Sequence, residues 1–433
     1  MKKDNKKNRL VTIAVITSIL IPIFLVFFVI GFHSNELVIK PVHYALFLFL
    51  FITVSVWLAS IFVMLKNKNK IPKEKMSKSK KIVLIIFLSL EILGSSTFLI
   101  LMYSPIKFFR EWLISSAMVT MSHKYLATWF YSSEEIVRVL DANKIIEQDE
   151  EVDLDSIKFN GQFNRDDYEN EYEREIFTLE NLSDPYKIIP ISAKNFEGYL
   201  AVIYDPSRIS VATTKYLNTT GQYVTEMAAD AKALLAINGG SFLDQNQKGT
   251  GGIPEGVLIK NGKVLSDKPY TSSGGVIGFT EDNKLILGKM NAKQALSKGV
   301  RDAVSFRPFL IVNGKKSFTK GNGGWGTAPR TAIGQRQDGI VLMLVVDGRT
   351  VKNPGASIVD VMNILYKYGA YNASNLDGGT SSVMVLPKEE AKKYITKKEM
   401  QTHCKKDYCY INDVVNGSGA HVTRPVVSSF IVK

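Results

Sequence analysis

Four clusters in the C-terminal half of the chain combine the side chains that chemistry on an anionic substrate requires. Each lies next to an apolar run, and the ends of strands are where a scaffold usually places active-site loops. Taken alone, each cluster is typical of a turn. Together they predict one site built from carboxylates, arginines and glycine backbone. The clusters are Asn238-Gly239-Gly240-Ser241-Phe242, Pro329-Arg330-Thr331-Ala332, Asp347-Gly348-Arg349 and Asn375-Leu376-Asp377-Gly378-Gly379-Thr380-Ser381-Ser382.

Several common catalytic signatures are missing from the sequence. The fourth cluster lacks the lysine and the spacing of a phosphate-binding P-loop, and there is no Gly-x-Ser-x-Gly elbow. Beyond the first hundred residues the only histidines are His123, His403 and His421. Histidine-based catalysis and histidine-ligated metal are therefore poorly supported. We expect no cofactor; no loop has a recognisable ligand spacing for Ca²⁺ or Mg²⁺, although acidic oxygens near the glycine loops leave such an ion open.

Six motifs in one order resemble the phosphodiester glycosidase family. The resemblance covers about residues 190–433 and departs from the family pattern at two positions. Ser241 stands where the family often has a bulky aromatic residue, and Thr380 stands where it often has a third glycine. The motifs are AINGGSF at 236–242, PEGVLIKNGKV at 254–264, PRTAIG at 329–334, VVDGR at 345–349, NLDGGTSSVMV at 375–385 and RPV at 424–426.

The resemblance implies cleavage of a sugar 1-phosphodiester, in which the sugar C1 is attached to a phosphate. Such a phosphate leaves as a weak base, so a strong general acid is less necessary than in ordinary glycoside hydrolysis with its two carboxylates. A carboxylate is still required to activate water or to stabilise an oxocarbenium-like sugar. We expect Asp377 to be this carboxylate, with Asp347 as the second choice.

The remaining cluster residues are predicted to bind substrate. Arg330 and Arg349 suit phosphate, because a planar guanidinium group binds it through two hydrogen bonds. The structural alternative is that either arginine pairs with Asp347 to brace the fold, or that Asp347 caps a turn. Glu255 and His421 rank below these residues as participants. The other predicted contacts to sugar hydroxyls or phosphate oxygens are Asn238, Gly239, Gly240, Gly378, Gly379, Thr380 and Ser381.

The elements that must position these clusters indicate an α+β domain, with a mixed β-sheet and packed helices. The strand expected over 340–347 is apolar up to Asp347 at its end and is predicted to be central and buried. Helices are expected over 224–234 and over 357–368, the second ending at Gly369. Short strands are expected at 198–204, 207–213, 234–237, 382–386 and 426–432, with hairpins at 256–265 and 275–287.

Three long apolar runs precede this domain, and each is long enough to cross a bilayer as a helix. They are Val11–Ile30, Ala45–Leu65 and Ile82–Tyr103, so residues 1–103 are predicted to be a membrane anchor with three transmembrane helices. A cleaved signal peptide would explain only the first run. Glu91, inside the third run, is either a functional group or part of helix packing.

The distribution of charge argues for a membrane and against nucleic acid. The formal net charge is +13, and residues 1–9 and 66–81 together supply +11 of it. The rest of the chain is therefore nearly neutral and offers no basic surface for nucleic acid. Because positively charged loops stay in the cytoplasm, the N-terminus is predicted inside and everything after Tyr103 outside the cell.

Residues 104–184 are predicted to be a connector and residues 185–433 the extracellular domain. The connector begins with an amphipathic helix within 106–131 and a second helix over 134–143. Residues 147–175, rich in Asp, Glu and Asn, are expected to form an exposed spacer. Cys404 and Cys409, the only two cysteines, predict an extracellular disulfide. Zinc is the alternative, with only His403 nearby as a further ligand.

The expected function is that of a membrane-anchored extracellular hydrolase of sugar 1-phosphodiesters. Its partners would be the lipid bilayer and a phosphate-containing surface polysaccharide, either teichoic acid or exopolysaccharide. A transferase would use the same site, with an acceptor hydroxyl in place of water. A catalytically silent, membrane-tethered polysaccharide-binding protein is the alternative from another class. A transporter or sensor ranks last, because three spans with one carboxylate offer little for a transport path.

Overall fold

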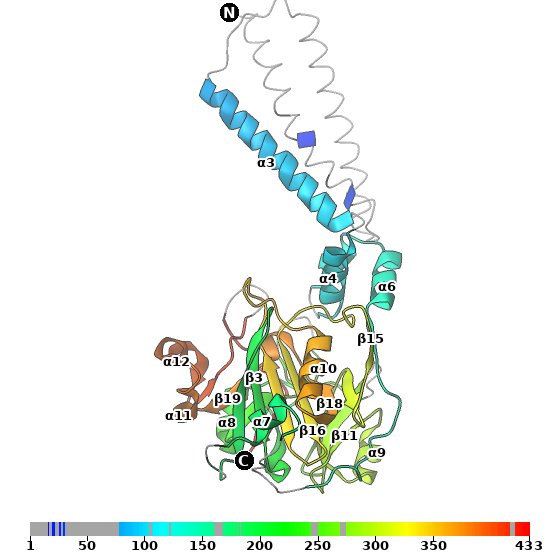
Figure 1. The fold of residues 1–433 in the computed structure, drawn as a ribbon, viewed down its shortest axis with the longest axis vertical. Coiled ribbons are helices and arrows are strands. Elements are labelled where there is room, and N and C mark those ends of the chain that lie inside the picture. The colour runs from blue at the N-terminus through cyan, green and yellow to red at the C-terminus, as the bar shows by residue number, and fades with distance from the viewer. Residues whose placement is uncertain are drawn as a thin grey trace, which may run out of the picture. The chain divides into compact units, whose positions relative to one another are not determined.

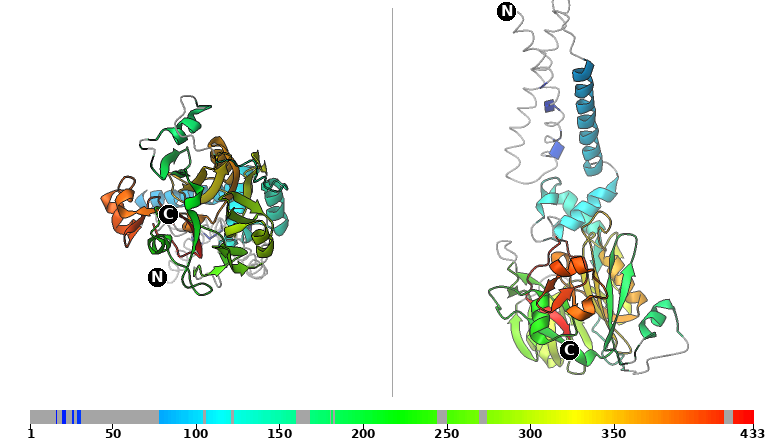
Figure 2. Two further views of the ribbon diagram at one scale, coloured as in Figure 1. Left: turned by 90° about the horizontal axis from the view of Figure 1, so that it is seen from below. Right: turned by 90° about the vertical axis from the view of Figure 1, so that its left-hand side faces the viewer.

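The computed structural model describes residues 78–433 except 104–105, 121–122, 160–167, 180, 182, 244–249, 269–273 and 416–420, together with isolated positions between 16 and 30. The chain divides into two compact units, Met1–Ala142 and Asn143–Lys433. Figure 1 labels the helices and strands, and Figure 2 shows them from two further directions.

The described part of the first unit is helical. Its helices are α3 (Lys78–Tyr103), α4 (Lys107–Met118), α5 (Tyr125–Thr128) and α6 (Ser133–Ala142). The side chains of Met102, Ile114, Tyr131 and Val139 share one small apolar core. The Tyr131 hydroxyl donates to the Met102 carbonyl oxygen over 3.2 Å. The predicted amphipathic segment 106–131 is therefore two helices, and the helix expected over 134–143 is confirmed as α6.

The predicted membrane spans have different outcomes. The runs 11–30 and 45–65 lie outside the described residues, apart from isolated positions in the first. The third predicted span, 82–103, is helical as expected and forms most of α3. Glu91 and the polar stretch Ser95-Ser96-Thr97 interrupt its apolar sequence. Within the described part of the chain, no helix is long and apolar enough to cross a membrane, so the span over 82–103 is not supported.

Three antiparallel sheets dominate the described part of the second unit. The seven-stranded sheet has the order β14 (Lys315–Lys316), β13 (Phe309–Val312), β18 (Ala370–Asn375), β16 (Arg330–Arg336), β17 (Val341–Val346), β3 (Glu197–Ile203) and β2 (Tyr186–Ser192). The six-stranded sheet has the order β20 (Cys404–Lys405), β21 (Tyr408–Tyr410), β19 (Met384–Pro387), β5 (Leu235–Asn238), β22 (Ser428–Val432) and β4 (Ile209–Thr213). The five-stranded sheet has the order β11 (Leu285–Gly288), β10 (Gly275–Thr280), β12 (Val300–Phe306), β8 (Val257–Lys260) and β9 (Lys263–Asp267).

Two short ribbons and several helices complete this unit. The ribbons are β1 (Lys144–Ile146) with β15 (Phe318–Lys320), and β6 (Phe242–Leu243) with β7 (Ile253–Pro254). The helices are α7 (Glu171–Phe177), α8 (Val224–Ala231), α9 (Ala292–Ser297), α10 (Ile358–Lys367), α11 (Lys388–Ala391) and α12 (Lys397–His403), with single 3₁₀ turns η2 (Pro206–Arg208) and η4 (Gly379–Ser381).

The α+β class is confirmed, but the prediction of a mixed sheet is wrong for the described strands. Within these three sheets, the strand pairs all run antiparallel. Parallel neighbours need long crossover connections, whereas hairpins such as β8–β9 and β10–β11 require only a tight turn. The apolar strand expected over 340–347 predicted burial and a central position, and it carries no information on the direction of its neighbours.

The position of β17 explains its unbroken apolar sequence. Val341, Met343 and Val345 face a core shared by the three sheets. Leu342 and Leu344, which point to the other face, join a second core beneath α7 and α10. In Figure 1, α10 lies across the strands of this sheet near β16 and β18. The expected central position of the strand is confirmed, because β17 pairs with β16 and β3 and has core on both faces.

Local sequence signals account for the loop and helix boundaries. Asn261 and Gly262 both have positive φ, 49° and 70°, which a tight turn between β8 and β9 requires. Ser357 caps α10 by accepting from the Asp360 amide, and Gly369 follows the helix with φ 80°. The helix expected over 224–234 ends earlier, because Lys232 adopts the left-handed conformation that terminates α8.

The start of the predicted spacer is held within the second unit rather than exposed. Just before it, strand β1 pairs with β15 in the register Ile145↔Thr319. Both carboxylate oxygens of Glu147 accept backbone hydrogen bonds, from Phe309 over 2.7 Å and from Gly274 over 2.8 Å. Acidic composition predicted solvation, but these carboxylates satisfy the amides of loops and strand ends that would otherwise lack acceptors.

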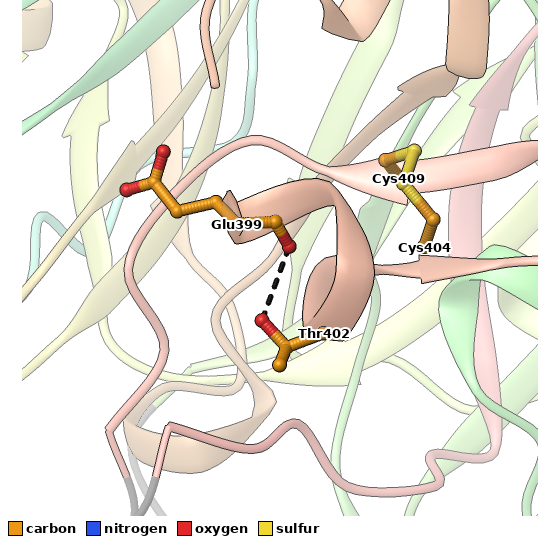
Figure 3. Close-up of a disulfide and its surroundings, with 4 residues drawn as sticks. All are labelled: Glu399, Thr402, Cys404 and Cys409. Carbon is orange, nitrogen blue, oxygen red and sulfur yellow. Dashed lines mark hydrogen bonds between the residues drawn. A yellow bond between two sulfur atoms is a disulfide. The ribbon is translucent and has the colours of Figure 1, made fainter. Parts of the chain in front are cut away.

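The disulfide expected between Cys404 and Cys409 is confirmed. The two residues lie opposite each other in the β20–β21 hairpin, with Cα atoms 4.0 Å apart. Figure 3 shows the bond beside α12, where the Thr402 hydroxyl donates to the Glu399 carbonyl oxygen over 3.1 Å. The bridge therefore fixes the end of α12 to the edge of the six-stranded sheet.

Candidate active site

The antiparallel register brings three of the four polar clusters together at the same end of three neighbouring inner strands of the seven-stranded sheet. The first residue of β16, Arg330, pairs with Val346 at the end of β17, and Ala332 pairs with Asn375 at the end of β18. The loops that follow are joined by backbone hydrogen bonds, including one from Gly379 N–H to the Pro329 carbonyl oxygen over 2.9 Å. The clusters predicted from the sequence are thus neighbours in space.

The fourth cluster reaches the same place from the six-stranded sheet. Strand β5 ends at Asn238, and the carbonyl oxygen of Gly239 accepts from the Asp377 amide over 3.2 Å. The Asn238 side chain donates to the Asp377 carbonyl oxygen over 2.6 Å. The site therefore lies where the strand ends of two sheets meet. Asp377 follows β18 of the seven-stranded sheet, and its backbone is bonded to residues that end β5 of the six-stranded sheet.

Asp377 is the carboxylate at the centre of this arrangement. Its Oδ1 atom accepts from the Gly378 amide over 3.0 Å. Its Oδ2 atom is buried, and no described residue donates to it with hydrogen-bonding geometry. Burial raises the pKa of Asp377, while the charge of Arg424, the Ser381 side chain, the Gly378 amide and the charge of Arg349 act in the opposite direction. A carboxylate with one oxygen fixed and one free is suited to accept a proton from water or to face a developing positive charge.

Asn238 was predicted to hold substrate, but its amide is used within the protein. Its oxygen accepts from the Thr331 hydroxyl over 2.7 Å and from the Val383 amide over 3.2 Å. The residue is fully buried. Since its nitrogen also bonds the Asp377 backbone, the contacts favour a role in positioning Asp377 over a direct contact with sugar.

The glycines permit close approach of backbone. A Cβ atom on Gly239 would lie 2.6 Å from Ser428 Oγ, and one on Gly240 would lie 2.6 Å from the Ser305 carbonyl oxygen. Their amides donate to the Ser428 carbonyl oxygen and to Ser428 Oγ, so they are already engaged inside the protein. We had predicted these amides as ligand donors; the contacts favour packing instead.

Arg349 and the loop after Asp377 are fitted to one another. The Arg349 side chain is partly solvent-exposed and donates to the Thr380 hydroxyl over 2.8 Å. Gly379, at φ 63°, leaves room that a Cβ atom would fill at 2.7 Å from Arg349 Nη2. Arg349 itself has φ 66°, a conformation that costs an ordinary residue about 1 kcal/mol or more and that concentrates at functional sites.

Arg330 is buried, and its donors are largely satisfied by the protein. Nη2 donates to the carbonyl oxygens of Trp325 and Gly326 over 2.6 and 3.0 Å, and Nε donates to that of Ala356 over 3.3 Å. Burial, with the charge of Arg349 as the second cause, lowers the pKa of Arg330 to about 10, against a smaller opposing effect of Asp360. Arg330 therefore contributes charge to the site, while its hydrogen bonds brace the surrounding loops.

Arg424 belongs to the site and was absent from the predicted residues. Its guanidinium carbon lies 4.6 Å from the centre of the Phe242 ring, and its charge lowers the pKa values of Asp377 and Arg349. Desolvation is the first cause of the lower pKa of Arg349, and Arg424 is the second. The available sequence signal was the Arg-Pro-Val string immediately before the last strand.

Asp347 lies in a different setting from Asp377. It is buried, and its Oδ1 atom accepts from the Asn412 side chain over 3.0 Å. Asn412 also donates to the Ser382 carbonyl oxygen and accepts from the Met384 amide, so it ties Asp347 to the segment after the Asp377 loop. Burial raises the pKa of Asp347 to about 7, against hydrogen bonds from Asn412 and the Asp413 backbone. It does not form an ion pair with Arg330 or Arg349 in the structure.

Two lower-ranked candidates have specific partners. The Ser241 hydroxyl donates to Glu255, and the Glu255 amide donates to the Ser241 carbonyl oxygen over 3.2 Å. His421 pairs through Nδ1 with Asp413, whose backbone contacts Asp347. Neither Glu255 nor His421 has a recorded contact with Asp377 among the described residues.

No group of three or more metal-ligating side chains is present among the described residues. The structure thus brings Asp377, Arg330, Arg349, Gly378, Gly379, Thr380 and Ser381 together around the Asp377 loop, with Asp347 behind it. Sequence reasoning missed Arg424, Thr331 and Asn412. The catalytic and binding roles of all these residues remain predictions.

Comparison with known proteins links this geometry to a chemistry. A model of the phosphodiester glycosidase family matches residues 231–433, a range that includes all four clusters and Arg424. The SPbeta prophage-derived uncharacterized protein YomE of Bacillus subtilis (strain 168) is 27% identical over 209 residues, covering 46% of this chain. The match spans 32% of the length of that relative.

Solved structures give weaker likenesses. The catalytic domain of zebrafish N-acetylglucosamine-1-phosphodiester alpha-N-acetylglucosaminidase, auto-inhibited by its pro-peptide, is 21% identical, with a TM-score of 0.44 over 57% of this chain and 82% of that chain. A hypothetical protein from Synechocystis is 15% identical, with a TM-score of 0.39 over 57% and 61%. A putative exported protein from Burkholderia pseudomallei is 15% identical, with a TM-score of 0.38 over 55% and 74%.

Proposed function

We propose that the phosphodiester glycosidase domain matched over residues 231–433 is an active hydrolase that cleaves the glycosidic bond of sugar 1-phosphodiesters. The observation that carries this proposal is the charge of the site. The charge of Arg349 lowers the pKa of Arg330, and the charge of Arg424 lowers the pKa of Arg349. Asp377 is the carboxylate whose pKa is lowered by both Arg424 and Arg349, against the larger effect of burial. A site with this excess of positive charge is suited to an anionic substrate.

The phosphate would be bound by Arg349 and Arg424. Arg349 is accessible to solvent, and its Nη1 atom reaches Thr380, so the guanidinium edge and a hydroxyl lie together. Hydrogen bonds from arginine to phosphate are charge-assisted and often come in pairs, which fixes the orientation of the ligand. Arg330 would act through its positive charge alone, because it is buried and its hydrogen bonds go to carbonyl oxygens of the protein.

The reaction then needs one carboxylate close to the sugar. The bond between C1 and the phosphate oxygen breaks, and its electron pair leaves with the phosphomonoester. The oxygen of a water molecule bonds to C1, and the proton of that water passes to Asp377. Since burial raises the pKa of Asp377, its carboxylate is a stronger base than an exposed aspartate. Arg349 and Arg424 would stabilise the charge that develops on the leaving phosphate.

Asp347 would act through its neighbours. It accepts hydrogen bonds from the Asp413 backbone and from Asn412, and Asn412 in turn holds Ser382 and Met384 at the end of the Asp377 loop. We therefore assign Asp347 as a positioning residue whose ionisation near pH 7 alters the order of that loop.

The cellular setting is proposed from the sequence. The Cys404–Cys409 disulfide favours a domain that works outside the cell, and the apolar runs 11–30 and 45–65, which lie largely outside the described residues, would supply a membrane anchor. The substrate would then be a phosphate-containing surface glycopolymer, either teichoic acid or exopolysaccharide. A transferase reaction would use the same residues with a polymer hydroxyl in place of water.

The test is release of free sugar by the full-length protein from a synthetic N-acetylglucosamine 1-phosphodiester. Activity that is lost in Asp377→Asn but kept in Asp407→Asn, a matched change at an exposed aspartate, would support the proposal. Absence of release, with tight polymer binding that survives Asp377→Asn, would instead identify a polysaccharide-binding protein.

A further inference from the structure

A fourth arginine lies next to the proposed phosphate site. The guanidinium carbon of Arg307 is 5.3 Å from the centre of the Trp325 ring, and that of Arg330 is 5.5 Å from the same centre. Phe306 also contacts this tryptophan, with ring centres 6.4 Å apart. Both Arg307 and Trp325 are partly exposed. One aromatic ring thus connects an accessible arginine to the buried Arg330.

Arg307 is tied to the loop that carries Asp377. Its carbonyl oxygen accepts from the Asn375 side chain over 2.8 Å, and the Asn375 amide donates to the Pro308 carbonyl oxygen over 3.1 Å. Asn375 is the last residue of β18, two positions before Asp377. On the other side, Arg330 Nη1 lies 3.9 Å from the position of a Cβ atom built on Gly378. Arg307, Trp325 and Arg330 therefore form a continuous extension of the site.

The charges along this extension are only partly balanced by the protein, because Asp360 acts on Arg330 and Asp377 on Arg349 without forming an ion pair with either. Within the described part of the chain, neither Arg307, Arg330 nor Arg349 forms an ion pair with a carboxylate. The Arg307 side chain also donates no hydrogen bond to any described residue. Contact with the Trp325 face orients a guanidinium group while leaving its N–H donors available, since the attraction is to the ring quadrupole.

One phosphodiester group does not require all four neighbouring arginines, which are Arg307, Arg330, Arg349 and Arg424. The proposed function requires one phosphate, which Arg349 and Arg424 can hold with Thr380. Burying or crowding further like charges without counter-charges is unfavourable, and an anion that occupies the extension would relieve it. A substrate with a second phosphate at the neighbouring repeat supplies that anion.

We propose that Arg307, oriented by Trp325, is a second phosphate subsite, which recognises the adjacent repeat of a glycan chain carrying one phosphodiester per repeat. This inference rests on the proposed function and refines it: the preferred substrate is a polyanionic polymer rather than an isolated sugar phosphodiester. The subsite is joined to the proposed phosphate site through Trp325, which Arg307 and Arg330 both contact, and through Arg330, on which the charge of Arg349 acts.

The test compares two synthetic substrates that differ in the number of phosphates. One is the methyl phosphodiester of N-acetylglucosamine 1-phosphate, and the other is a chain of three such repeats joined by phosphodiesters. With the full-length protein, Arg307→Gln should lower kcat/KM on the three-phosphate chain about tenfold. The loss should exceed that on the one-phosphate substrate at least fivefold, and the dependence of kcat/KM on salt should become less steep for the chain.

A matched control removes a charge elsewhere. Arg174 is exposed on α7, and Arg174→Gln should leave both substrates and both salt dependences unchanged. Trp325→Leu, which keeps Arg307 but removes its aromatic support, should reproduce the selective loss in weaker form. Equal losses on the two substrates, or an unchanged rate on the three-phosphate chain, would overturn the second subsite.

Binding separates this inference from the proposed function. If the wild-type protein releases sugar from neither substrate, the proposed hydrolysis fails, and calorimetric titration with the same two compounds tests the subsite by itself. Tighter binding of the three-phosphate chain that disappears in Arg307→Gln would support the subsite. Binding of both compounds with equal affinity, or with no change in Arg307→Gln, would contradict it.

Discussion

The two ends of strand β16 each carry an arginine, and the two arginines have opposite surroundings. Arg336, at the end of the strand, pairs with Asp338 over 2.9 Å and approaches Glu173 at 3.8 Å. It also donates to the Tyr368 carbonyl oxygen and packs on Phe177. Arg330, at the start, forms no ion pair with a described carboxylate and lies close to Arg349.

This difference separates an arginine balanced within the fold from one that we propose adds positive charge to a binding site. At Arg336 two carboxylates balance the charge, so removing it leaves buried partners unsatisfied and affects folding. At Arg330 no described carboxylate forms an ion pair, and the charge of Arg349 acts on it more strongly than that of Asp360, so its positive charge is less fully balanced than that of Arg336. An enzyme that binds an anion needs the second arrangement, and it accepts some loss of stability to keep it.

The largest effect on activity short of removing Asp377 is expected at Arg424. Arg424→Gln should lower kcat/KM for sugar 1-phosphodiesters by about 10²–10³-fold, the usual loss when one preorganised donor to a developing charge is removed. The midpoint of thermal unfolding should change by only a few degrees. Steady-state kinetics and a melting curve on the same preparation measure both. A variant with wild-type kcat/KM would remove Arg424 from the site.

The reciprocal change is expected at the other end of the strand. Arg336→Gln should destabilise the fold by about 3 kcal/mol, because it leaves the largely buried carboxylates of Glu173 and Asp338 without their positive partner. Urea unfolding measures this change. The kcat/KM of the folded fraction should stay within about threefold of the wild type, on the reading that this end has no part in binding. If activity fell as far as in Arg424→Gln, the comparison between the two ends would be wrong.

Alanine substitutions at Gly379 and Gly262 test whether the fit between the Asp377 loop and Arg349 affects activity. Gly379→Ala combines a strained φ with a clash against Arg349, and should cost about 1–2 kcal/mol and reduce kcat/KM at least tenfold. Gly262→Ala places the same strain, φ 70°, in a hairpin where no atom lies within 4 Å of the added Cβ. It should cost similar stability and leave kcat/KM unchanged. Equal kinetic effects in the two variants would show that the Arg349 contact is unimportant.

The smallest effect is expected at Asp347 and concerns pH. Its pKa is raised from 3.8 to about 7, so the folded protein holds this proton more tightly than the unfolded chain. The associated stability is present below pH 3.8 and is lost as the pH rises through about 7. Asp347→Asn keeps the acceptor for Asn412, and should therefore reduce the decrease in melting temperature between pH 5 and pH 8.

The kinetics of the same variant distinguish positioning from catalysis. A positioning role predicts a loss of less than about tenfold in kcat/KM, with a flatter profile around pH 7. A loss of about 10³-fold or more at every pH would instead make Asp347 a catalytic carboxylate.

Much of the fold could be read from short-range signals in the sequence. Paired Asn261-Gly262 predicts the β8–β9 turn because both residues accept positive φ, and Ser357 with Gly369 marks the ends of α10. The orientation of the strands could not be read in this way. The apolar run of β17 indicates that both faces of the strand are buried. It does not show whether the neighbouring strands are parallel or antiparallel, because helices on one face and other sheets on the opposite face bury it in either case.

The candidate site was predictable where a motif marks a strand end. Asp377, Arg330 and Arg349 were found in this way, and the antiparallel register brings them together. Their individual contacts could not be foreseen, because a motif does not show which backbone oxygens a side chain will reach. Asn238 donates to the distant Asp377 carbonyl oxygen, and Arg330 donates to those of Trp325 and Gly326 in its own loop. Arg424 was missed for a related reason, since a lone arginine before a closing strand carries no signal of what it faces.

The central claim is that the bond broken lies between the sugar and the phosphate oxygen, and hydrolysis in water enriched in ¹⁸O tests it most directly. The full-length protein would be given a synthetic N-acetylglucosamine 1-phosphodiester, and both products would be examined by mass spectrometry at early times. The account predicts that ¹⁸O enters the sugar at C1 and that the phosphate carries none, with no products from Asp377→Asn. Label in the phosphate would show cleavage of the phosphorus–oxygen bond and would contradict a glycosidase.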